Sequence, residues 1–158
     1  MLLRELQSML AGLYDAPAEH DVHDFLITDA AHAAALQGAV DGPATDEQLL
    51  LAEDEGGLGL SLYLDRAVLE RLLVRCPLRE LSDDNLADYC TALEGVSHFH
   101  YVVWNAAHAR SVSLLDLELQ AEVDKYASAL RLLLAQRDGK SPGELFERLF
   151  ERASFLPT

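Results

Sequence analysis

Residues Gln48–Leu64 read QLLLAEDEGGLGLSLYL, and this stretch predicts the β part of the fold. The adjacent glycines Gly56 and Gly57 supply the positive φ angles that a tight turn needs. After the turn, leucines alternate with smaller or polar residues, which is the period of a strand that buries one face. We therefore expect an antiparallel hairpin over residues 48–64.

The residues before this hairpin predict a helix, a strand and a second helix. Leucines recur every three to four positions up to Leu13, as one face of an amphipathic helix requires, and Pro17 stops that helix. Val22–Thr28 (VHDFLIT) has the β-branched and aromatic content of a strand. Asp29 is a residue type that caps helices, and it precedes a short helix over Ala30–Gln37.

The residues after the hairpin predict helices alone. Asp65, Ser82 and Ser113 are helix-capping residue types, each placed before a run with helical periodicity. Because the connection 109–112 is short, the two long helices should lie antiparallel. The face of the second helix turned toward the first helix or the sheet should carry Leu119, Val123, Tyr126, Leu130 and Leu133. The expected helices run from 65 toward 75, from 82 to about 108, from 113 to about 136 and from 142 to 153.

These elements predict an α+β fold. A small antiparallel sheet, made of a hairpin at about 48–64 plus a strand at about 22–28, should pack on a helical C-terminal half with a long antiparallel helix hairpin. The length of 158 residues favours a single domain over 1–158. Its α/β part should span residues 1–81 and its helical part residues 82–158.

Charge and cysteine content narrow the classes of function. The formal net charge of -15 opposes approach to nucleic-acid phosphates and to anionic lipids, so we expect neither direct nucleic-acid binding nor membrane association. The same charge favours a protein partner that is basic. The two cysteines, Cys76 and Cys90, form no metal-binding spacing and no disulfide framework, which fits a cytoplasmic location.

The stretch Glu94–Asn105 (EGVSHFHYVVWN) is the most unusual in the chain. On a helix, Glu94, His98, Tyr101 and Asn105 fall in one polar stripe, while most of the remaining circumference is apolar. If that stripe is buried, its polar groups need partners. Gly95 weakens the helix by about 1 kcal/mol relative to alanine, which favours a close approach of another part of the backbone at that point.

Folding the two long helices together predicts a candidate polar cluster. Counting residues from the turn brings the level of His98 near Glu122, and Glu118 lies one helical turn from Glu122. Carboxylates and an imidazole are ligands for zinc, iron or manganese. Glu94, His98, Glu118 and Glu122 are therefore the candidate metal ligands, although the spacing matches neither a di-iron nor a zincin motif and equally fits solvated ion pairs.

Three functional interpretations remain open from the sequence. The first is a non-catalytic acidic interaction module, such as an adaptor, a small chaperone or a regulatory subunit, that needs no cofactor and binds a protein partner. The second is a metal-binding protein or metal-dependent enzyme that holds a divalent transition metal in the cluster. The third is an inhibitor that mimics a nucleic acid. A homodimer through the long helices fits the first two. Because no complete catalytic motif is present, the sequence favours a protein that is not an enzyme.

Overall fold

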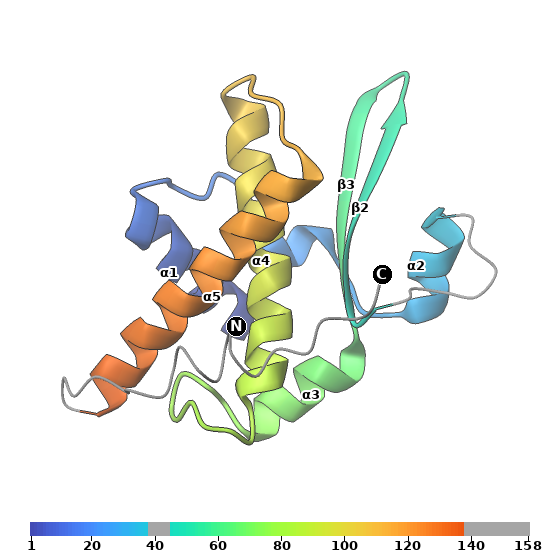
Figure 1. The fold of residues 1–158 in the computed structure, drawn as a ribbon. Helices are drawn as coiled ribbons and strands as arrows, with labels where there is room; N and C mark the ends of the chain where they lie inside the picture. The colour runs from blue at the N-terminus through green and yellow to red at the C-terminus, as the bar shows by residue number, and fades with distance from the viewer. Residues whose placement is uncertain (38–44, 138–158) are drawn as a thin grey trace.

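Helix α4 lies at the centre of the fold, with helices on one side and the sheet on the other (Figure 1). The computed structural model describes residues 1–37 and 45–137, so the helix expected over 142–153 lies outside the described residues. The elements are α1 (Leu2–Tyr14), the 3-10 helix η1 (Val22–Phe25), β1 (Leu26–Ile27), α2 (Ala30–Gln37), β2 (Glu47–Asp54), β3 (Gly57–Leu64), α3 (Arg66–Val74), α4 (Leu86–Ala107) and α5 (Leu114–Gln136). The predicted α+β fold with a long antiparallel helix hairpin is confirmed.

The hairpin forms where the sequence predicts it. Strands β2 and β3 pair antiparallel from Glu47 opposite Leu64 to Asp54 opposite Gly57. Two residues, Glu55 and Gly56, connect the strands. Gly57 has a φ of 123°, a backbone angle that residues other than glycine rarely adopt. The glycine pair therefore sets both the position of the turn and the register of the strands.

The strand expected over Val22–Thr28 is shorter than the sequence predicts. The Asp21 side chain accepts a hydrogen bond from the His23 backbone N–H at 2.9 Å and caps η1, so extended backbone begins only at Leu26. Strand β1 then pairs with β3 in parallel, which gives a mixed sheet in the order β1-β3-β2. The sheet is thus antiparallel within the hairpin and parallel at β1, where a fully antiparallel sheet was expected.

Helix α4 starts later than the sequence predicts. Ser82 does not cap it, because residues 82–85 form a turn in which the Ser82 N–H donates to Asn85 Oδ1 at 2.9 Å. The helix begins at Leu86, after Asn85. The other predicted starts agree with the structure: Asp65 accepts from the Ala67 N–H, and Ser113 forms a reciprocal capping box with Asp116.

The second half of α5 turns the expected residues inward. Leu133 is buried in the main core, and Tyr126 and Leu130 pack against that core.

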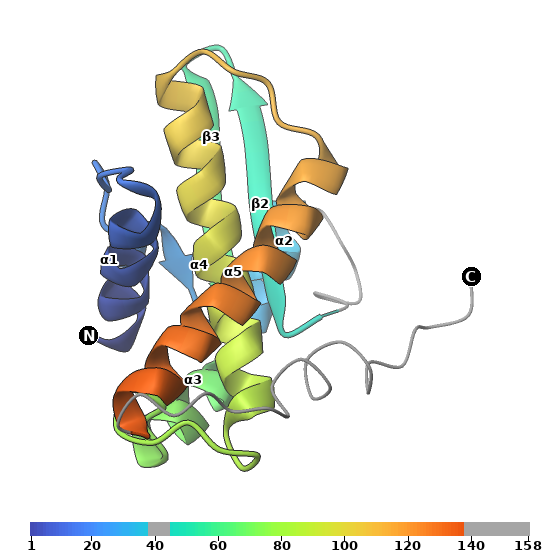
Figure 2. The same cartoon turned by 60° about the vertical axis from the view of Figure 1, so that its left-hand side comes forward.

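The first half of α5 differs from the expectation. Leu119 and Val123 point to solvent, with 57% and 55% of their surfaces exposed, instead of facing α4 or the sheet. Ala121, Ser128 and Ala129 are fully buried in their place. Small side chains allow α5 to approach α4 closely as it crosses that helix obliquely (Figure 2), so the contact face is set by residue size and not by hydrophobicity.

The two faces of the sheet pack against different helices. Leu62 and Leu64 of β3 are completely buried on the face that meets α4 and belong to the main hydrophobic core. On the opposite face, Tyr63 packs with Leu50 and with Ala33 of α2 in a second, smaller cluster. The sheet is therefore covered on both faces at the end where β2 begins.

Gly95 permits the closest contact between α4 and the sheet. A Cβ atom at this position would lie 3.0 Å from Glu47 Cγ and 3.1 Å from a methyl group of each of Leu62 and Leu64. A close approach is thus present at Gly95, but side chains of the sheet make it, and not the second backbone that was expected. This contact brings the first residue of β2 beside α4.

Among the described residues, no helix is both long enough and apolar enough to cross a membrane.

We expect Gly95→Ala to lower the free energy of unfolding by about 1 kcal/mol, because displacement of the sheet costs more than the helix propensity that alanine adds. Gly12→Ala is the matched control, since a Cβ atom at Gly12 in α1 meets nothing within 4 Å. That variant should gain up to about 1 kcal/mol. Urea denaturation measures the free energy of unfolding of both variants. An equal gain in stability for Gly95→Ala and Gly12→Ala would contradict a close contact at Gly95.

Candidate metal centre

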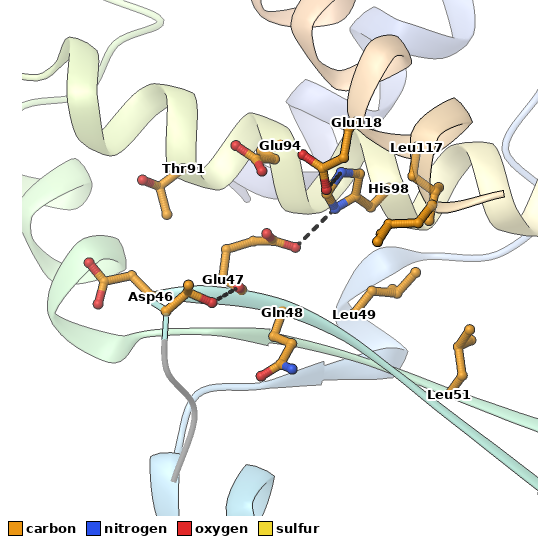
Figure 3. A pocket seen from close by; sticks show the side chains of 12 residues that line it. Asp46, Glu47, Gln48, Leu49, Leu51, Thr91, Glu94, His98, Leu117 and Glu118 are labelled. Atoms are coloured by element: carbon orange, nitrogen blue, oxygen red, sulfur yellow. Dashed lines mark hydrogen bonds and ion pairs between the residues drawn. The ribbon is translucent and has the colours of Figure 1, made fainter. Parts of the chain in front are cut away.

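A cavity of about 770 Å³ lies between β2, α4 and the first turns of α5. Figure 3 shows its two ends: carboxylates gather around His98 at one end, and leucines line the other. Each element brings a side chain to the polar end, namely Glu47 at the start of β2, Glu94 and His98 one turn apart on α4, and Glu118 on α5. The four residues thus come from three elements that are distant in the sequence.

His98 is the most buried member of this group. Its side chain is 6% exposed, and its Nδ1 atom lies 3.3 Å from Glu47 Oε1. The Glu47 side chain is itself only 11% exposed. On the other side of the ring, Nε2 lies 3.8 Å from Glu118 Oε1, too far for a hydrogen bond, and it is buried with no hydrogen-bond partner. The histidine therefore stands between two carboxylates with one ring nitrogen unsatisfied.

Within residues 1–37 and 45–137, one group has the composition and spacing to hold a metal ion. It consists of Glu47, Glu94 and His98, whose ligand atoms, one from each residue, all lie within 4.8 Å of one another. Ligands at the usual distance of about 2.1 Å from a tetrahedral metal lie roughly 3.4 Å apart. The separation of 3.3 Å between His98 Nδ1 and Glu47 Oε1 already matches that value.

Lys125 of α5 forms an ion pair with Glu94 and is not itself a candidate metal ligand. Its Nζ atom lies 3.2 Å from Glu94 Oε2 and 2.5 Å from Glu122 Oε1. Burial by itself lowers the pKa of Lys125, but the hydrogen bond to Glu122 and the two carboxylate charges outweigh it, and the pKa is raised. The lysine therefore stays charged and pairs with one oxygen of Glu94, a residue that also lines the cavity.

The structure brings together some of the residues in the predicted cluster and separates others. Glu94, His98 and Glu118 line the same cavity. Glu122 reaches Glu94 only through Lys125, so contacts on α5 occur about one turn earlier than counting from the connection predicts. The physical reason is the oblique crossing of the two helices (Figure 2), which counting equal steps ignores.

Tyr101 and Asn105 do not belong to this cavity. The buried Asn105 side chain donates to the Tyr101 carbonyl at 2.8 Å, within its own helix. Tyr101 lines a smaller cavity, of about 190 Å³, together with Trp104 and Tyr14. The predicted polar stripe is therefore divided: Glu94 and His98 line the larger cavity, Tyr101 lines the smaller one, and Asn105 lines neither.

Glu47 is the member of the candidate site that sequence reasoning missed. It directly precedes the predicted hairpin, where an acid is ordinary, and nothing in the local pattern distinguishes it. The available signal was Gly95, whose position within a helix indicates that another segment approaches closely. The sequence did not say which segment that was, so it gave no means of pairing Glu47 with His98.

A second buried polar cluster joins α1, α4 and α5. Asp124 accepts hydrogen bonds from Ser97 Oγ at 2.6 Å, from Gln120 Nε2 at 2.9 Å and from the Tyr14 hydroxyl. Because three donors satisfy this carboxylate, we interpret the cluster as structural.

Comparisons of the chain with protein-family models, with curated proteins and with solved structures found no match.

The carboxylates around His98 predict a measurable pKa. Burial lowers the pKa of this imidazole, but the hydrogen bond to Glu47 and the nearby negative charges outweigh burial, so the pKa lies above its ordinary value. Protonated His98 between these carboxylates stabilises the folded protein. This contribution is fully present below about pH 6.5 and is lost as the pH rises through the raised pKa of His98. In metal-free protein, NMR titration should place His98 above the ordinary value, and Glu47→Gln should lower it.

His100 serves as the internal reference in this titration. It is buried two residues away, and burial lowers its pKa with only partial compensation from Asp124. The two imidazoles should therefore titrate on opposite sides of the ordinary histidine value of about 6.5. Titration of His98 at or below that of His100 would show that the carboxylates do not face it.

Proposed function

We propose that this chain binds a divalent transition metal ion through Glu47 and Glu94 and through Nδ1 of His98. The observation that supports the proposal is the arrangement of three ligand atoms from two elements within 4.8 Å, at the wall of a cavity. Two carboxylate oxygens and one imidazole nitrogen form a ligand set that suits zinc, iron or manganese. The fold thereby assembles a site that no segment of the sequence contains by itself.

The electrostatics of the cavity favour a cation. Glu47, Glu94 and Glu118 contribute three negative charges to it, and Lys125 is shared between Glu94 and Glu122. Carboxylates that are removed from water are costly unless they are paired or coordinate a metal. A divalent ion between Glu47 and Glu94 would neutralise both, which a single protonated imidazole cannot do.

Glu118 has the position of an outer partner to the site. Histidines that ligate metals usually donate their other ring N–H to a carboxylate, which fixes the tautomer. With Nδ1 on the metal, the unsatisfied Nε2 becomes that donor, and the Glu118 carboxylate stands 3.8 Å away. A small movement of Glu118, whose side chain is half exposed, would complete this hydrogen bond.

Three protein ligands leave coordination positions open toward the cavity, which is typical of catalytic and not of structural metal sites. The leucine-lined end of the cavity adjoins those positions, so a bound water or a small substrate with an apolar part has room beside the metal. The proposal therefore includes a metal-dependent activity. We propose the cytoplasm as its location, because Cys76 and Cys90 are free thiols.

A metal-binding measurement tests this function with graded variants. Isothermal titration with Mn²⁺ or Zn²⁺ after chelator treatment should give one ion per chain. Glu47→Gln, Glu94→Gln and His98→Ala each remove a ligand and should weaken binding by at least about 100-fold. Glu118→Gln removes only the outer carboxylate and should weaken it by about 10-fold. An ion at 100 times its dissociation constant should add about 2.7 kcal/mol to the free energy of unfolding.

Glu70→Gln is the matched control for these variants. Glu70 lies on α3 and lines a different cavity, so this variant removes one carboxylate and the same net charge without touching the proposed site. It should bind metal as the wild type does. Equal weakening in Glu70→Gln and Glu94→Gln would mean that metal binding reflects only the acidity of the chain, and the proposed site would then be wrong.

A further inference from the structure

The outer face of α5 carries large apolar side chains that no described element covers. Leu115, Leu119 and Val123 have 66%, 57% and 55% of their surfaces exposed. They follow one another at intervals of four residues, so they form a continuous stripe along more than two turns of the helix. We call these three residues the outer stripe.

The outer stripe points directly away from the core. A helix advances about 100° per residue, which places the fully buried Ala121 and Ser128 on the side opposite to Leu119. Exposed leucines at isolated positions are common, but three in line on the far side of a helix are not explained by packing within the described residues. A helix with this pattern is typical of a surface that binds another helix.

Carboxylates border the outer stripe on both sides. By the same helical geometry, Glu118 and Glu122 lie along one edge, and Asp116 lies beside Leu119 along the other. A second copy of the chain would bring these acids against like charges on a molecule of net charge -15. Phosphate headgroups would be repelled for the same reason. The charges therefore select a partner that is both apolar and basic.

We propose that the outer stripe of α5 is the docking face for a basic amphipathic helix of a partner protein. Apolar side chains of that helix pack on Leu115, Leu119 and Val123, and flanking lysines or arginines pair with the bordering acids. The ligands of the proposed metal site lie on β2 and α4, and none of them belongs to the outer stripe. The bordering acids are shared, because Glu118 also faces His98 and Glu122 also pairs with Lys125. The outer stripe is then the surface through which an acidic interaction module, as the composition leads one to expect, engages its partner.

The test uses the full chain, with chelator present so that metal occupancy plays no part. The probe is a fluorescent 15-residue helical peptide of leucine and lysine, with its leucines spaced to form one face. Fluorescence anisotropy should show saturable binding that weakens steeply with salt. Replacement of the outer stripe by L115S/L119S/V123S should weaken binding at least 10-fold at an unchanged net charge.

Two controls distinguish binding at the outer stripe from non-specific hydrophobic binding and from binding by charge alone. L73S/V74S removes another pair of exposed apolar side chains, on α3, which are 76% and 83% exposed, and it should bind the peptide as the wild type does. A peptide with glutamate in place of lysine should not bind. Equal affinity of the triple-serine variant and the wild type would overturn the proposal.

Other occupants of the stripe give different results, each of which contradicts a basic partner helix. A dimer in light scattering that the triple-serine variant abolishes would assign the face to a second copy. Stripe-dependent binding to anionic lipid vesicles would assign it to a membrane. Peptide binding seen only after Phe146→Asp and Phe150→Asp would show that the chain's own segment 142–153 occupies it.

Discussion

The close contact of α4 with the sheet at Gly95 is the constraint on which the rest of the structure depends. Because residue 95 has no side chain, Leu62 and Leu64 pack directly on the helix backbone. The same contact fixes the start of β2, and therefore Glu47, beside the helical turn that carries Glu94 and His98. A single missing methyl group thus determines both the packing of the sheet and the geometry of the proposed metal ligands.

The parts of the fold that were predictable depend on local backbone chemistry. The glycine pair at 56 and 57 fixes the hairpin, and Ser113 fixes the start of α5, because each acts on its immediate neighbours. The inward face of α5 was predictable at Leu130 and Leu133 but not at Leu119 and Val123, where the small residue Ala121 faces α4 instead. Residue size decides which stripe meets α4 once a second helix is present, and a periodicity argument contains no information on that fit.

The candidate site was likewise predictable where its residues lie in one segment or in adjacent helices, and not where they come from distant elements. The turn of α4 that carries Glu94 and His98 follows from helical spacing within one segment, and the antiparallel connection brings Glu118 to it. Glu47 comes from an element 51 residues before His98, and no local pattern links the two. Long-range pairings of polar residues depend on the relative placement of whole elements, which sequence patterns leave open.

The first turns of α5 carry leucines on two opposite faces. Leu114 and Leu117 line the cavity beside His98, while Leu115 and Leu119 of the same turns face outward. A ligand that shifts this segment on one side also shifts it for whatever contacts the other. Thermodynamic linkage makes such an effect reciprocal: the factor by which cavity occupancy alters affinity at the outer surface equals the factor in the reverse direction. If the cavity and the outer stripe both bind a ligand, α5 would therefore couple the two sites.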